Sequence, residues 1–247
     1  MLSAFLWGLL ATSSLIFGGV IVTRFSLSKR IIGIILGFGA GTLISAVSYE
    51  LIYESIKLAK GTGYTGFGLF AGAFIFYISD WLIERYGVAN RMKQKPSGSS
   101  GIVIPIVLGI ILDGIPESIV IGLGLFEAGT ISLTMMVAVF ISNLPEAIAG
   151  SSGMKANGWG RKKITLLWLS IAIICALFTL AGFSLFSSAS NQWLAFIQAF
   201  AAGAILMMLA NSMIPEAYEQ GGKLAGVFTV LGFAVSVFMV ILEVSGA

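Results

Sequence analysis

The stretch Leu112-Asp113-Gly114-Ile115-Pro116-Glu117-Ser118, LDGIPES, places two carboxylates and a proline inside an apolar run that extends from residue 101 to residue 126. A carboxylate in apolar surroundings is costly unless a proton, an ion or a polar partner offsets its charge. The run therefore raises two questions: what environment covers its apolar side chains, and what compensates the charges within it.

The composition of the whole chain answers the first question. Apolar residues make up 57% of the sequence and charged residues 10%, and the mean hydropathy is +1.00. A soluble domain has roughly a quarter of its residues charged, so the sequence predicts an all-α integral membrane protein and excludes a soluble globular fold. The chain has no histidine, and any ion chemistry must therefore use oxygen ligands. We expect the single cysteine, Cys175, to serve in packing.

Eight segments are long enough to cross a bilayer, which takes about 20 apolar residues. Gly, Ser, Asn, Lys and Arg cluster in the breaks between them, and no loop is long enough for a soluble domain. We therefore expect a single transmembrane transporter domain, residues 1–247, with spans at about 3–23, 31–56, 65–86, 101–126, 130–154, 164–186, 193–218 and 221–243.

Lysine and arginine near the ends of spans indicate which loops face the cytoplasm. Twelve of the 14 such residues lie in the loops that follow the first, third, fifth and seventh spans, and only Lys57 and Lys60 lie on the other side. This bias predicts cytoplasmic basic loops and both termini outside. We expect the membrane to be a cell membrane, either plasma or inner.

Two spans resemble each other in sequence. GFGAGTLIS (37–45) matches AFAAGAILM (199–207) small residue for small residue, and the offset of 162 also pairs Glu54 with Glu216. By the predicted topology the two spans run in opposite directions. Inverted repeats are common in transporters, with sites near the membrane midplane, so we expect an inverted 3+2+3 arrangement.

A short pattern of an apolar residue, Pro, Glu and a small residue occurs three times, in GIPES (114–118), NLPEA (143–147) and MIPEA (213–217). Proline removes a helical hydrogen bond and frees a carbonyl oxygen. Asp113 and Glu117 lie four residues apart, and Asn143 and Glu146 three apart, so each pair projects from one side of its helix. The sequence has no Lys or Arg between residues 96 and 154. A bound cation, which takes carboxylate, amide and carbonyl oxygens, is therefore the compensation that we favour.

A simpler interpretation remains open for these motifs, because each Pro-Glu could be a kink with a protonated glutamate. Glu127 is most simply a loop charge and Glu243 a tail charge.

With these residues the chain resembles the ZIP family of metal transporters, the ZRT/IRT-like proteins. In that family the fourth span usually reads His-Asn-x-Pro-Glu-Gly and the fifth His-x-x-Pro-Glu. Here Pro116 and Glu117 match the fourth-span Pro-Glu, while Asp113 replaces the histidine and Gly114 the asparagine. In the fifth span Ser142 replaces the histidine, and Asn143, Pro145 and Glu146 fall on the remaining motif positions. The chain therefore looks like a histidine-free, divergent member.

The resemblance implies import of divalent metal ions into the cytoplasm, with zinc as the family default and iron or manganese as alternatives. The ions are the transported substrate, and we expect no catalytic cofactor and no nucleic-acid partner. It also implies a homodimer in the lipid bilayer and relative movement of spans one, four, five and six against the others. We expect Glu117 and Glu146 to be the main ligands. The predicted metal-site residues are Asp113, Glu117, Ser142, Asn143, Glu146 and Glu216, of which Glu216 would assist entry, exit or proton transfer.

Two other functions stay open at this point. The histidine-free site could have lost metal selectivity and carry protons or another small cation. Alternatively, Asp113 and Glu117 could act as general acid and base of an intramembrane enzyme, although no cysteine or activated serine nucleophile lies beside a base. We favour transport without enzyme activity.

Overall fold

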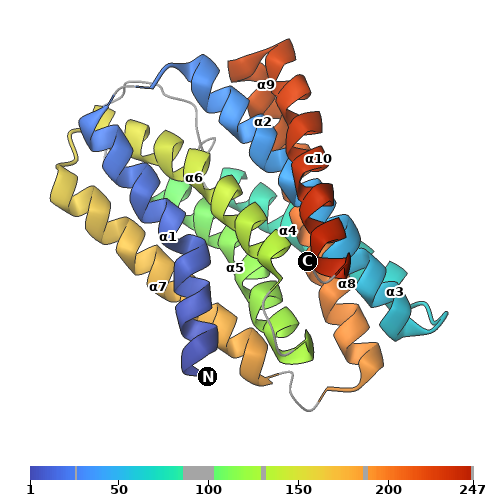
Figure 1. Cartoon of the computed structure of the whole chain (residues 1–247). Coiled ribbons are helices and arrows are strands. Elements are labelled where there is room, and N and C mark those ends of the chain that lie inside the picture. The colour runs from blue at the N-terminus through green and yellow to red at the C-terminus, as the bar shows by residue number, and fades with distance from the viewer. Residues whose placement is uncertain (26, 86–102, 129–131, 186–188, 246–247) are drawn as a thin grey trace.

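The computed structural model of the chain is built from helices and describes residues 1–25, 27–85, 103–128, 132–185 and 189–245. Figure 1 shows the arrangement. The α-helices are α1 (Leu2–Arg24), α2 (Lys29–Ala46), α3 (Tyr53–Ala59), α4 (Tyr64–Arg85), α5 (Val103–Ala128), α6 (Leu133–Ala156), α7 (Arg161–Leu185), α8 (Asn191–Met208), α9 (Ile214–Gly221) and α10 (Lys223–Ser245). Two π-helical segments, Val47–Ile52 and Leu209–Met213, join α2 to α3 and α8 to α9.

The π-helical segments turn α2–α3 and α8–α9 into two continuous helical runs, Lys29–Ala59 and Asn191–Gly221, of 31 residues each. The backbone stays in the right-handed helical region at both ends of each segment. In a π-helix each hydrogen bond spans five residues instead of four, which widens the helix locally. The sequence predicted both spans but gave no sign of these segments.

Seven helical runs within the described residues are long and apolar enough to cross a membrane. They correspond to seven of the eight predicted spans, with ends that agree within a few residues, and the 26-residue α5 occupies the place of the predicted fourth span. The predicted basic loop with Arg91, Lys93 and Lys95 lies outside the described residues.

Local sequence explains where several helices begin and end. Ser28 and Ser132 cap α2 and α6, since their hydroxyls accept hydrogen bonds from Ile31 N at 3.3 Å and from Met135 N at 3.1 Å. Gly222 adopts a positive φ of 61° between α9 and α10. Only glycine takes such a conformation without strain, so the chain turns there.

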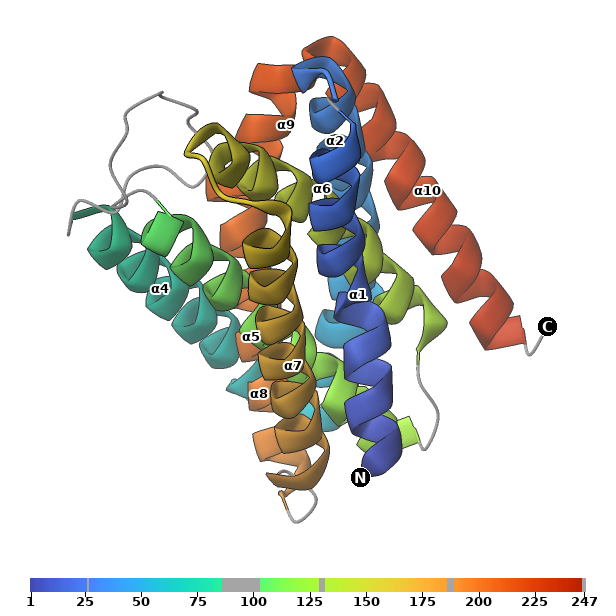
Figure 2. The ribbon, with the colours of Figure 1, turned by 90° about the vertical axis from the view of Figure 1, so that its left-hand side faces the viewer.

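The helices form two groups. In the first, α1 packs against α6 and α7, and α5 packs against α7 and α6. In the second, α2 packs against α10 and α8 packs against α4. The groups meet where α2 contacts α6 and where α5 contacts α8. Figure 2 shows α4 and α10 on opposite sides of the molecule.

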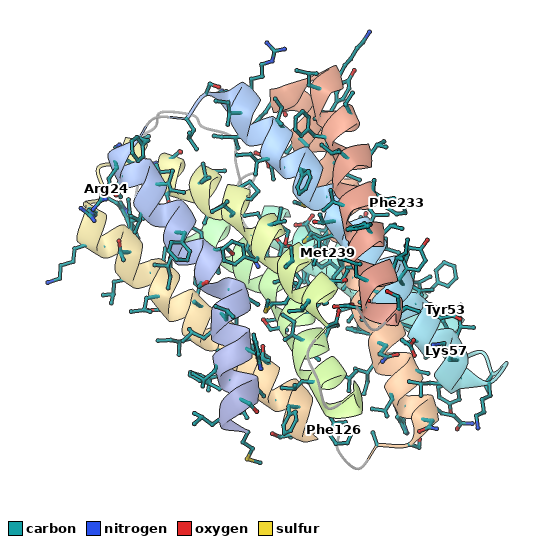
Figure 3. All side chains as sticks on the ribbon, in the orientation of Figure 1. Arg24, Tyr53, Lys57, Phe126, Phe233 and Met239 are labelled. Carbon is teal, nitrogen blue, oxygen red and sulfur yellow. The ribbon has the colours of Figure 1, made fainter. Side chains whose placement is uncertain are left out.

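The outermost helices, α4 and α10, expose large apolar side chains. Phe67, Phe70 and Phe74 on α4 are 62–76% exposed, and α10 presents Val227 and Val230 in the same way. Such continuous apolar surfaces are expected against lipid rather than water. Figure 3 shows Arg24 and Lys57 far apart, at opposite ends of the molecule.

Candidate functional site

Five of the six predicted site residues lie on α5 and α6, which pack against each other. They are Asp113 and Glu117 on α5, and Ser142, Asn143 and Glu146 on α6. None of the five is more than 5% exposed. The helical spacing that predicted a shared face therefore brings polar side chains of both helices into the interior.

The Glu117 carboxylate connects the two helices. Ser142 Oγ donates a hydrogen bond to Glu117 Oε1 at 3.4 Å, and Asn143 Nδ2 donates to Glu117 Oε2 at 3.3 Å. Asn143 Nδ2 donates its second hydrogen to the carbonyl oxygen of Val139 in its own helix, at 2.9 Å. Ser142 has a single hydroxyl hydrogen, which is shared between Glu117 Oε1 and the Val139 carbonyl oxygen at 3.0 Å. Each oxygen of the Glu117 carboxyl group thus has one donor from α6, so the buried group has hydrogen-bond partners on the neighbouring helix.

The three acidic side chains do not form a ready metal cage as they stand. Across the described ranges, no three Cys, Asp or Glu side chains are arranged so that they could hold one metal ion. A cation at this place would need Glu117 and its donors to reorient. What the structure provides is a buried set of oxygen atoms on two adjacent helices, each with a proline in its interior, Pro116 and Pro145.

The sixth predicted residue, Glu216, is placed differently. It is half-buried on α9, where its Oε1 accepts a hydrogen bond of 2.6 Å from Gln220 Nε2. Helix α9 packs mainly against α2 and α10. Glu216 therefore belongs to the second helix group, whereas the other five residues belong to the first.

A glycine of α2 brings the second group close to the site. A Cβ atom built on Gly39 would lie 3.1 Å from Ser142 Cα and 3.0 Å from Met213 Cε. Met213 is the last residue of the second π-helical segment. The contact between α2, α6 and this segment therefore lies at the level of Ser142. Because π-helical segments are frequent at functional sites, the position of this segment beside Ser142 supports a functional role for the region.

The sequence did not indicate that Cys175 is near the site. Its thiol is 1% exposed on α7, beside Ser118 and within electrostatic reach of Glu117 and Glu146. A Cβ atom built on Gly114 would lie 2.9 Å from Cys175 Sγ. The expected packing role holds, since Cys175 fills the space that Gly114 leaves, but the space adjoins the buried carboxylates. Only the pairing of α5 with α7 shows this.

The fold and the site define a multi-pass helical membrane protein with buried carboxylates between two proline-containing helices. No family model matches the chain. The chain is 25% identical over 191 residues to a protein of Arabidopsis thaliana described as a "putative zinc transporter". The match covers 76% of this chain and 30% of that protein, so the chain spans less than a third of its relative. This distant homology is consistent with membership of the ZIP family.

Proposed function

We propose that the chain carries divalent metal cations across the membrane and into the cytoplasm through the oxygen-lined region between α5 and α6. The observation that carries this proposal is the burial of Asp113, Glu117 and Glu146 on two adjacent helices, with Glu117 shared between them. An ionised carboxylate at the bilayer centre costs about 3 kcal/mol on insertion scales, and a mobile cation offsets that cost. The description of the Arabidopsis relative as a zinc transporter supports the same class.

In this proposal Glu117 and Glu146 are the main ligands, and Asp113 and Asn143 complete the site. The hydroxyl oxygen of Ser142 contributes a further ligand. Asn143 now directs its Nδ2 at Glu117. It would have to turn its amide so that Oδ1 faces the ion, because only the oxygen can act as a ligand. Glu216, on the other helix group, assists entry or exit.

Zinc is the default substrate because of the resemblance to the ZIP family, with iron and manganese as the alternatives. The lack of histidine leaves carboxylate, amide and hydroxyl oxygens, which suit harder cations such as Mn²⁺ better than Zn²⁺. We therefore expect weaker binding of zinc here than at an imidazole-containing site.

We further propose that the two helix groups move relative to each other and that the chain contains an inverted repeat. The π-helical segments begin at Val47 and Leu209, 162 residues apart, which is the offset found in the sequence. Gly41 approaches the Thr229 carbonyl of α10, and Gly203 approaches the Leu69 carbonyl of α4 at the same offset. The α2–α10 and α8–α4 pairs thus use equivalent glycines, which supports a repeat and the alternating access associated with one.

Both termini are proposed to lie outside a cell membrane, with the chain acting as a homodimer. The sequence bias of Lys and Arg supports the orientation, and the resemblance to the ZIP family implies the dimer.

Uptake by protein reconstituted in vesicles tests the proposed function. Glu117→Ala should abolish uptake of Zn²⁺ and Mn²⁺ while the protein remains folded. The matched control is Glu219→Ala, which removes an exposed carboxylate of α9 and should leave uptake unchanged. Uptake by Glu117→Ala at the wild-type rate would remove Glu117 from the site.

A second candidate is a transporter of protons or another small cation. The observation that favours it is the absence, within the described part of the chain, of three acidic or thiol side chains arranged to hold a metal. A panel of divalent ions separates the two: a metal site raises the melting temperature of the wild type more than that of Glu117→Ala. No rise with any divalent ion would favour the proton carrier. The homology to a transporter speaks against the intramembrane enzyme.

A further inference from the structure

The carboxylate of Glu243, near the end of α10, lies at the beginning of α6. Its Oε1 accepts a hydrogen bond from Thr134 N at 3.0 Å. Its Oε2 accepts from Thr134 Oγ1 at 3.0 Å and from Ser132 Oγ at 3.4 Å. The sequence predicted only a tail charge at this position. The structure instead gives it three donors that are more than 100 residues away in the chain.

The position suits a carboxylate for two reasons. The first backbone N–H groups of a helix have no partner within the helix, and Thr134 N is one of them. The helix dipole also places partial positive charge at this end, which attracts an anion. Ser132 supplies the ordinary cap within the same chain segment, through the hydrogen bond from Met135 N. Glu243 adds a second cap from another helix.

The contact joins the two helix groups. Helix α10 packs against α2 in the second group, whereas α6 packs against α1 in the first. At the other end of α6, Lys155 Nζ donates a 2.9 Å hydrogen bond to the Val22 carbonyl near the end of α1. Helix α6 is thus held at its beginning by α10 and near its end by α1.

The hydrogen bonds between Glu243 and Thr134 constrain both the position of α6 along its axis and its rotation about that axis. One carboxylate binds the backbone N and the side-chain hydroxyl of the same residue, so the helix can neither slide nor turn without losing a bond. Ser142 and Asn143 follow within the same helical stretch, before Pro145. A displacement of Thr134 is therefore transmitted to the donors that hold Glu117.

We propose that Glu243 is a positioning residue for the cation site, acting through the first turns of α6. The proposal rests on the proposed function, because its transport readout requires the α5–α6 site to bind the transported ion. Glu243 does not touch the ion. It sets the register in which Ser142 and Asn143 meet Glu117.

The test uses the full-length protein in vesicles with Mn²⁺ and Zn²⁺ as probes. Glu243→Gln should raise the ion concentration for half-maximal uptake about fivefold, the scale of one ordinary hydrogen bond, with little change in the maximal rate. Thr134→Val removes one donor without changing any charge and should act in the same direction. The double variant should be no worse than Glu243→Gln alone, because both changes break one contact.

Salt distinguishes positioning from simple attraction of cations by a surface charge. Attraction is screened as ionic strength rises, so the difference between Glu243→Gln and the wild type would vanish. A difference that persists at high salt supports positioning. Unchanged half-maximal concentrations in both Glu243→Gln and Thr134→Val would overturn the proposal.

Hydrogen–deuterium exchange provides a readout that does not depend on transport. Glu243→Gln should speed amide exchange from Thr134 through the Ser142–Asn143 turn, while α7 exchanges as in the wild type. If the wild type carries no divalent ion, the proposed function fails, and exchange alone then decides whether Glu243 positions α6. Faster exchange confined to the first turn would overturn the positioning role.

Discussion

At the residue scale, the buried carboxyl group of Glu117 has a hydrogen-bond donor for each of its oxygens. Glu117 has two carboxylate oxygens, and one donor from α6 serves each of them. Asn143 also bonds the Val139 carbonyl, so its amide group holds the local helix and the interhelical contact together. Removing such a donor leaves a buried polar group without its partner, which costs more than the hydrogen bond itself contributes.

Asn143→Ala should therefore lower the free energy of unfolding by about 1–3 kcal/mol, the penalty for a buried polar group that loses its partner. Asn157→Ala is the matched control, because Asn157 Nδ2 bonds the Gly153 carbonyl at the partly exposed end of the same helix. That change should stay within about 0.5 kcal/mol. Thermal and denaturant unfolding in detergent measure both. Equal effects of the two changes would contradict the proposed importance of the Glu117 contact.

The contact between Gly114 and Cys175 makes a second prediction at this scale. Gly114→Ala places a Cβ atom 2.9 Å from Cys175 Sγ, and the thiol must rotate away at a cost of about 1–3 kcal/mol, as in other overpacked cores. Cys175→Ala should remove most of that cost in the double variant, giving a coupling of about 0.5–3 kcal/mol. Gly124→Ala, in the same helix with nothing within 4 Å, is the control and should be neutral or stabilising. Additive effects of Gly114→Ala and Cys175→Ala would show that the two residues do not share this space.

At the scale of the elements, glycines determine how closely the helix pairs of the second group can approach. Gly41 lies against the Thr229 carbonyl and Gly203 against the Leu69 carbonyl, so neither contact can be relieved by rotating a side chain. Small residues permit this close approach of helices in membranes. The stripe of small residues was visible in the sequence, but the partner helix of each glycine was not.

Gly41→Ala and Gly203→Ala should each destabilise the protein by about 1–3 kcal/mol or more, because the added Cβ meets backbone and the helices must separate. Gly226→Ala on α10, with open space around it, should be tolerated. Melting temperatures of the three variants check this. Similar losses at positions 41 and 203 are what an inverted repeat requires; a loss at only one of them would count against equivalence of the two pairs.

At the scale of the whole molecule, the length of the apolar segments and the scarcity of charge within them were enough to predict the helices. A membrane span requires both properties. The spacing of Asp113 with Glu117 and of Asn143 with Glu146 predicted that each pair shares one face of its helix, and all four side chains are buried. The π-helical segments could not be predicted because they depend on packing between distant helices. The places of Cys175 and Glu243 depend in the same way on pairings of α5 with α7 and of α6 with α10.

The orientation of the molecule in the membrane is the last property that the charges predict. Lys57 and Lys60 lie at the end of the molecule that we propose to be outside, whereas Arg24, Lys155 and Arg161–Lys163 lie at the end that we propose to be cytoplasmic. Gly63 and Gly160 lie in connecting segments at these two ends, and a Cβ atom built on either meets nothing within 4 Å. Single cysteines at these positions, in a Cys175→Ala background, are therefore matched reporters.

A membrane-impermeant maleimide applied to intact cells should label Gly63→Cys, and should label Gly160→Cys only after the membrane is permeabilised. The reason is that translocating the cluster of positive charges beside Gly160 is disfavoured during insertion. Labelling of Gly160→Cys alone in intact cells would show that the orientation is the reverse of the proposed one. The proposed direction of ion movement, into the cytoplasm, would then lose its support from the charges. Labelling of both in intact cells would indicate that the charge bias is too weak to fix a single orientation.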